Sequence, residues 1–116
     1  MGAVINVGLD YRTHDGTTGR LARREVLDAV KRHRGVIADV QSVQSDSEPT
    51  LVITLVRPMA HRTLERLSAD LRQDAIAQFD GSSGHLAGPR AEDWGPFNPE
   101  FFFMPDGQRL AQSQAA

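Results

Sequence analysis

The sequence contains no cysteine, which excludes three kinds of chemistry at once. Without thiols the chain can form no disulfide scaffold, no cysteine-ligated zinc site and no thiol nucleophile. Long apolar runs are also missing, because no stretch approaches the roughly 18–20 residues of a membrane-spanning helix. The chain begins without the basic and apolar segments of a secretory signal. We therefore expect a cytoplasmic protein with no membrane partner.

Lysine is nearly absent, since Lys31 is the only lysine among 13 basic residues. The formal net charge of −2 argues against bulk affinity for nucleic acid. Arginines nevertheless gather over residues 20–34, around the first predicted helix. A nucleic-acid accessory protein that uses these arginines is therefore kept as the lowest-ranked alternative.

The 116 residues are enough for one domain with a real hydrophobic core. Alternating apolar residues predict strands over 3–11, 36–46, 50–57 and 74–80, with a short fifth strand over 85–88. Apolar residues at three- and four-residue spacing predict helices over 23–34 and 59–73. This β-α-β-β-α-β order with a terminal β-hairpin is typical of an α+β, ferredoxin-like split βαβ domain, which we place at residues 1–88.

In that topology both helices cover one face of the sheet and leave the other face open. We expect Val52 and Val56 on the open face, beside the polar residues of the first strand. A β-bulge near Gln41-Ser42 would explain a change of phase in the second strand. Gly35 is the expected left-handed residue at the end of the first helix.

Most of the aromatic residues lie in the C-terminal segment 89–107, which we call the lash. Five of the seven aromatics lie between residues 94 and 103, and four of the six prolines lie between residues 89 and 105. Proline removes amide donors, so this segment cannot be a central strand or a long helix. Burying one large apolar side chain is worth roughly 1.5–3 kcal/mol, so the lash should be covered. A polar tail is expected at residues 108–116.

The lash can be covered in three ways, and the sequence leaves all of them open. It can fold over the open sheet face of its own chain, it can contribute to the interface of a homodimer, or it can bind another protein. The expected interaction surface consists of Val52, Val56, Trp94, Phe97, Phe101, Phe102 and Phe103. We expect Trp94 and at least two of the four phenylalanines to be mostly buried in the assembly.

The loop 12–19 joins the first predicted strand to the first helix and is the candidate ligand site. Its candidate ligand residues are Asp10, His14, Asp15, Thr17 and Thr18. Backbone N–H groups before a helix can bind an anion, but the loop lacks the spacing of a phosphate loop or a dinucleotide fingerprint. The plain alternative is a connector with a turn at Asp15-Gly16.

No catalytic residue, metal site or cofactor is predicted. The four histidines are scattered, and no two of them share an element at metal-binding spacing. No serine has the context of an activated nucleophile. We therefore expect a non-catalytic interaction module that forms a homodimer or binds a protein partner. A small enzyme or ligand-binding protein, with its site between the loop 12–19 and the lash, is the alternative.

Three segments of the C-terminal half resemble small uncharacterised proteins of bacterial phages and mobile elements. They are residues 67–77 (LSADLRQDAIA), Gly88-Pro89 and residues 94–99 (WGPFNP). The resemblance implies a phage or bacterial origin, and it implies no activity for any residue.

Overall fold

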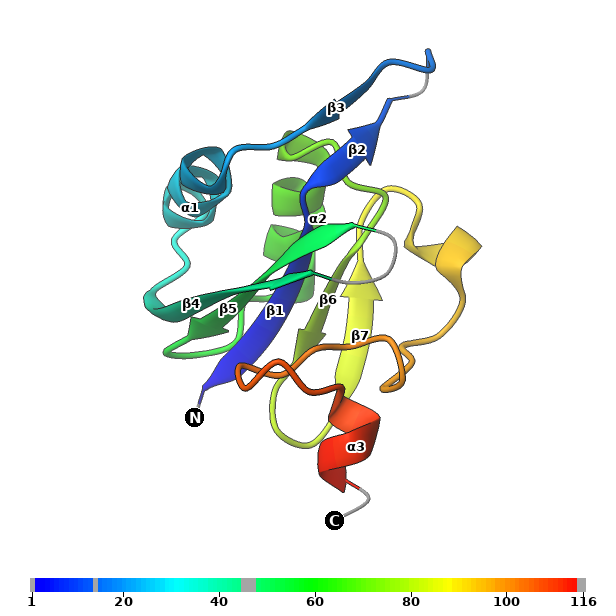
Figure 1. Cartoon of the computed structure of the whole chain (residues 1–116). Coiled ribbons are helices and arrows are strands. Elements are labelled where there is room, and N and C mark those ends of the chain that lie inside the picture. The colour runs from blue at the N-terminus through cyan, green and yellow to red at the C-terminus, as the bar shows by residue number, and fades with distance from the viewer. Residues whose placement is uncertain (1, 14, 45–47, 115–116) are drawn as a thin grey trace.

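The structure, a computed structural model, describes residues 2–13, 15–44 and 48–114. It is an α+β fold, as predicted, with three helices and a five-stranded antiparallel sheet in the order β4-β5-β1-β6-β7 (Figure 1). The sheet strands are β1 (Ala3–Gly8), β4 (Ile37–Gln44), β5 (Pro49–Leu55), β6 (Ile76–Phe79) and β7 (Gly84–Ala87). The helices are α1 (Arg23–Arg32), α2 (His61–Asp70) and α3 (Leu110–Gln114), with a short 3-10 turn, η1 (Ala91–Trp94).

The first hydrophobic core lies between the sheet and the helices α1 and α2. Apolar side chains at alternating positions of β1 and β5 meet the apolar stripes of both helices, as the periodicity predicts. The fully buried members include Ile5, Val7, Ile53, Val26, Val30, Leu64 and Leu67. Both helices therefore cover the same face of the sheet.

The second core lies on the opposite face, which is covered by the lash of the same chain. Phe102 is 1% exposed and packs on Val4, Val52 and Phe79. Asn6 of β1 holds the lash in place with two hydrogen bonds: its amide Nδ2 donates to the Phe103 carbonyl at 2.9 Å, and its Oδ1 accepts the Phe103 N–H at 2.7 Å. The polar face predicted for β1 thus binds the lash.

The predicted tail 108–116 differs from the structure, because it contains α3. Leu110 is buried in the second core, and its N–H donates to the Phe102 carbonyl at 2.7 Å. Leu110 is the only large apolar residue of this segment, which was too weak a pattern to predict this contact.

The predicted first strand, residues 3–11, is broken at Leu9 into two elements. The Leu9 N–H donates to the Pro49 carbonyl at 3.0 Å, and its carbonyl accepts the Leu21 N–H at 2.7 Å. Beyond this point β2 (Asp10–Arg12) leaves the sheet and pairs with β3 (Thr18–Arg20) in a separate hairpin. The sequence predicted this hairpin only as a loop.

The irregularity in β4 lies between Ile37 and Asp39, and the prediction near Gln41-Ser42 is wrong. The extra residue lets Ile37 and Val40, three positions apart, both pack on the helix-side core. Val36, which lies just before β4, is 43% exposed.

Both long helices end in the same hydrogen-bonded pattern with an arginine in the left-handed conformation. After α1, Arg34 (φ 65°) donates its N–H to Lys31, and Gly35 donates to Val30. After α2, Arg72 has φ 57° and the same pair of bonds follows. These are Schellman motifs, and the prediction that Gly35 takes the left-handed position is wrong by one residue.

Candidate functional site

The turn between β2 and β3 is closed by its own side chains. The carboxylate of Asp15 accepts hydrogen bonds from the Thr13 hydroxyl and from the Thr17 N–H, and these bonds lower the pKa of Asp15 to about 2. Thr18 is exposed on β3, and His14 lies outside the described residues. Asp15 and Thr17 therefore stabilise the turn, and with Tyr11, Thr13 and Arg72 they also line an open hollow of about 460 Å³.

The root of the β2–β3 hairpin is attached to the end of α2. The guanidinium of Arg72 lies 4.3 Å from the centre of the Tyr11 ring and donates a hydrogen bond to Glu25 of α1 at 3.2 Å. The Tyr11 ring covers Gly19 so closely that a β-carbon there would lie 2.4 Å from the Tyr11 hydroxyl. These contacts fix the hairpin beside the segment that leads from α2 into β6.

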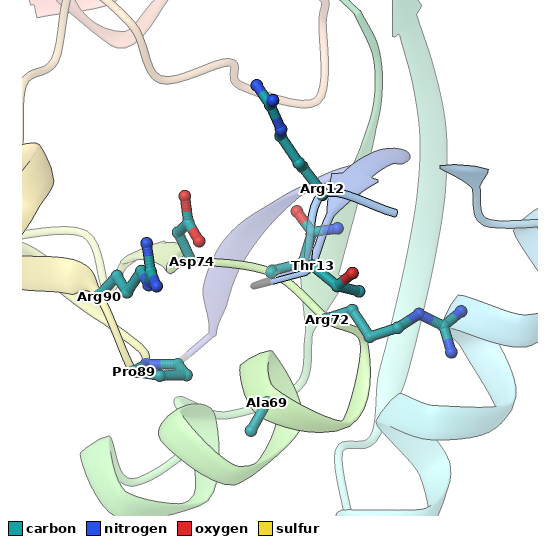
Figure 2. Close-up of a pocket in the computed structure, with 9 residues that line it drawn as sticks. Arg12, Thr13, Ala69, Arg72, Asp74, Pro89 and Arg90 are labelled. Atoms are coloured by element: carbon teal, nitrogen blue, oxygen red, sulfur yellow. The ribbon is translucent and has the colours of Figure 1, made fainter. Parts of the chain in front are cut away.

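An open groove of about 760 Å³, the arginine groove, lies between the hairpin, the end of α2 and the segment after β7. Its lining includes Arg12, Arg72, Arg90 and Asp74. Figure 2 shows Arg72 directed toward α1, away from Asp74 and Arg90, in agreement with its hydrogen bond to Glu25. The charges of this groove are therefore mixed.

A second groove, the sheet-face groove, adjoins the first and has a volume of about 390 Å³. Its floor is the lash-side face of the sheet, formed by Asn6, Ala77 and Leu86. It lies between β2 and Trp94 of the lash. This is the region in which the sequence placed the alternative ligand site.

Three carboxylates line the polar end of the sheet-face groove. The guanidinium of Arg20 donates to Asp10 at 2.7 Å and lowers the pKa of that carboxyl. Burial raises the pKa of Glu48, and the nearby charge of Asp10 adds to this effect, although Glu48 accepts the Asp10 N–H at 3.1 Å. Asp74 accepts a hydrogen bond from the indole Nε1 of Trp94 at 3.3 Å.

The apolar end continues into a smaller hollow of about 200 Å³ within the lash. Phe97 and Phe102 form its inner part, with their ring centres 5.2 Å apart. Trp94 and Phe101 line its rim and are 66% and 72% exposed. The prediction that Trp94 is buried is therefore wrong for the single chain, although Phe102 is buried and Phe97 and Phe103 are half-buried.

The local backbone explains why these two aromatics lie outside. Trp94 ends η1, and Gly95 with φ 75° then turns the chain back toward the sheet. Phe101 belongs to a turn in which its N–H donates to the Asn98 carbonyl at 3.0 Å. Each aromatic thus lies in a tight turn at the surface, where most of the neighbouring residues are exposed as well.

The two valines of the predicted interaction surface differ in their exposure to solvent. Val52 is fully buried beneath the lash, so it offers no surface for a partner. Val56 lies beyond the end of β5, where it is 49% exposed and donates its N–H to the Val36 carbonyl at 2.9 Å. The sheet face itself is therefore not available for a dimer contact.

Half of the basic residues around α1 lie beside carboxylates. Arg32 donates to Asp70 at 2.9 Å, and Arg24 lies 3.8 Å from Asp28. With Arg20 bound to Asp10, half of the six basic residues in this region have an acidic partner. This arrangement does not favour a nucleic-acid surface.

Side chains that could support catalysis have structural partners. The Ser68 hydroxyl donates to the Gln73 carbonyl at 2.9 Å, and His33 Nε2 lies 3.0 Å from Asp70. His61 and His85 are neighbours, with ring centres 5.6 Å apart. Within the described ranges, no three histidine, aspartate or glutamate side chains are grouped to hold a metal ion. In the same ranges, no helix has the length and apolar character needed to cross a bilayer.

Gln78 of β6 is a structural residue that the sequence did not reveal. Its side chain is buried in the helix-side layer, where it accepts the Met59 N–H at 3.0 Å and donates to the Met59 carbonyl at 2.9 Å. A polar residue at a core-facing strand position was the available signal.

Comparison of the chain with protein-family models, with curated proteins and with solved structures finds no match.

Proposed function

We propose that the protein is a non-catalytic binding module whose sheet-face groove holds a segment of a partner polypeptide. The scaffold is proposed to be a ferredoxin-like core, extended by β7 and the β2–β3 hairpin. The strand order supports this proposal, because β5 lies between β1 and β4. The two strands of the main sheet that precede and follow α1, β1 and β4, are therefore not neighbours. The active form is proposed to be a homodimer.

The observation that carries this proposal is the exposure of Trp94 and Phe101 at the rim of a formed groove. The other aromatics of the lash are buried or half-buried, so the chain covers most of this apolar surface itself. Large aromatics left exposed beside a hollow are typical of binding surfaces, where they contribute much of the binding energy.

The lining of the groove indicates the chemistry of the segment. An apolar side chain fits the end between Trp94 and Phe101, and a basic side chain fits the end that contains the carboxylate of Asp74. The charges of Asp10 and Arg72 are already balanced by Arg20 and Glu25. The proposed ligand is therefore an extended segment with an apolar residue followed by a basic one.

Selection of peptides from a displayed random library tests this proposal. We expect enriched peptides to carry the apolar–basic pair and to change the fluorescence of Trp94, the only tryptophan of the chain. Phe101→Ser should weaken their binding about tenfold or more. Truncating an aromatic residue that contributes strongly to an interface costs roughly 2 kcal/mol or more of binding free energy. Glu100→Ser, at the adjacent exposed position, serves as the control. Equal enrichment on the wild type and on Phe101→Ser would overturn the proposal.

A small ligand in the same groove remains the second candidate, because the groove lies between the hairpin and the lash and contains a carboxylate with a raised pKa, Glu48. A ligand of this kind would also change Trp94 fluorescence. It would compete with any selected peptide for the groove. It would also bind if the library yielded no peptide.

A further inference from the structure

The two edges of the sheet are unequal. β7 is four residues long, and the Phe97 ring of the lash lies directly over its Gly84. β4 is eight residues long and pairs with β5 on one side, and no other described strand pairs with its outer side (Figure 1). A row of backbone N–H and C=O groups along β4 is therefore open to another strand.

The outer edge of β4 has few of the devices that usually protect an edge strand. It contains no lysine, arginine or proline, and Asp39 is its only charged residue. The bulge between Ile37 and Asp39 lies at its start, so residues 39–44 pair regularly with β5. Val36 and Val56, two of the four large hydrophobic side chains that are exposed in the described part of the chain, lie beside this end of β4.

We propose that β4 pairs antiparallel with β4 of a second copy of this chain, which joins two sheets into one across a two-fold axis. This inference deepens the homodimer part of the proposed function by naming its interface. The same strand on both subunits forms the contact, as a two-fold axis requires.

Side-chain chemistry favours a register in which Val40 lies opposite Val40 of the second copy. Val40 is half-buried and packs on the helix-side core, so this pair extends that core across the axis. Asp39 then lies opposite Gln41 of the other copy. Within one chain the Gln41 amide already donates to Asp39 at 3.2 Å, so the two groups are suited to a hydrogen bond across the interface. No two carboxylates lie directly opposite each other in this register.

A second copy fits this edge better than a peptide from another protein. Antiparallel pairing of one strand with itself matches each polar residue with a neutral or complementary one, and it also covers both copies' unpaired edges at once. The groove stays accessible, because Trp94 and Phe101 belong to the lash beside β6 and β7 and not to β4.

Sedimentation equilibrium on the wild type and on the double variant Asp39→Lys/Gln41→Lys tests the interface. We expect a wild-type dimer at micromolar concentration and a dissociation constant about tenfold or more weaker in the double variant, because lysines then lie opposite lysines. Both positions are exposed, so the monomer should keep its fold, which circular dichroism checks. Glu92→Lys/Gln108→Lys, with the same change of charge at exposed positions away from β4, should leave the dimer unchanged.

The register has its own test, because the natural chain contains no thiol. Val40→Cys should form a disulfide-linked dimer under mild oxidation, since opposite residues of an antiparallel pair lie within disulfide distance. Ser113→Cys on α3 should not form such a dimer.

A wild type that is monomeric at high micromolar concentration would contradict both the dimer and its proposed interface. If the double variant dimerises with the same dissociation constant as the wild type, only the β4 interface is contradicted. Peptide binding to the groove is measured separately, so its result does not depend on the dimer.

Discussion

Phe101 and Phe102 are neighbours in the chain but lie in opposite environments. Phe102 fills the second core against Val52 and Phe79, whereas Phe101 is exposed at the rim of the groove. Phe102→Ala should lower the free energy of unfolding by about 3–5 kcal/mol, through lost transfer energy and a cavity. Phe101→Ala should change it by less than about 0.5 kcal/mol.

Urea denaturation of the two variants at one protein concentration makes this comparison. Each serves as the control for the other, because the substitution and the chain segment are the same. Similar unfolding midpoints would mean that the lash does not pack on the sheet as the structure has it.

His85 gives the stability a dependence on pH at the level of a single residue. Burial lowers the pKa of His85 from 6.5, and the adjacent His61 adds to this effect. As the pH falls below about 6.5, the unfolded chain takes up a proton at residue 85 that the folded chain resists, so stability should fall. Between about pH 7.5 and pH 5.5, the loss of stability should be smaller in His85→Gln than in the wild type. The reason is that residue 85 of the unfolded variant no longer takes up a proton.

Urea midpoints at the two pH values measure this difference. The titrating groups that do not contact residue 85 have the same surroundings in both proteins, so their contributions cancel in the comparison. An identical loss of stability in the wild type and in His85→Gln would contradict the assignment.

Asn6 and Gln78 show what single-residue reasoning could not reach. Both were visible as polar residues in apolar strands, and the prediction placed Asn6 correctly on the face opposite the helices. Their partners, Phe103 and Met59, lie 97 and 19 positions away in the sequence. Periodicity gives the face of a strand but not the distant backbone group that a side chain binds.

At the scale of elements, the ends of α1 and α2 offer a test of backbone conformation. Arg34 adopts the left-handed conformation, which costs a residue with a β-carbon roughly 1–2 kcal/mol and glycine almost nothing. Arg34→Gly should therefore stabilise the fold by about 0.5–1 kcal/mol, after allowance for the greater freedom of glycine in the unfolded chain. Lys31→Gly, inside the last turn of α1, should destabilise it by a similar amount.

Thermal unfolding of both variants distinguishes conformation from loss of a side chain. If both glycine variants are destabilised alike, then the left-handed strain at residue 34 is not the controlling factor.

The elements themselves were predicted well where their apolar pattern was long and regular. The helical stripe of Leu64 and Leu67 and the alternation in β1 and β5 appear in the structure as expected. The β2–β3 hairpin was missed because its strands are three residues long and partly exposed, so they carry no periodic signal. The bulge in β4 was misplaced because a shift of one residue in either position gives a similar pattern.

At the scale of the whole molecule, the sequence predicted two layers on one sheet, and it left open which chain provides the second layer. The structure shows the lash of the same chain on that face. The candidate groove was only partly predictable, because its walls come from β2, the end of α2 and the lash. The exposure of Trp94 depends on a turn at Gly95, which composition alone does not fix.

The two hydrogen bonds between Asn6 and Phe103 also bear on the order in which the molecule assembles. They close a span of 97 residues, whereas β1 pairs with β5 and β6 across shorter spans, of which the longest is the 75 positions from Val4 to Phe79. The entropy lost on closing a loop grows with its length, so contacts of long span form after local ones. The lash should therefore dock last on a sheet already supported by its helices, and it should be the first part to leave that sheet during local unfolding.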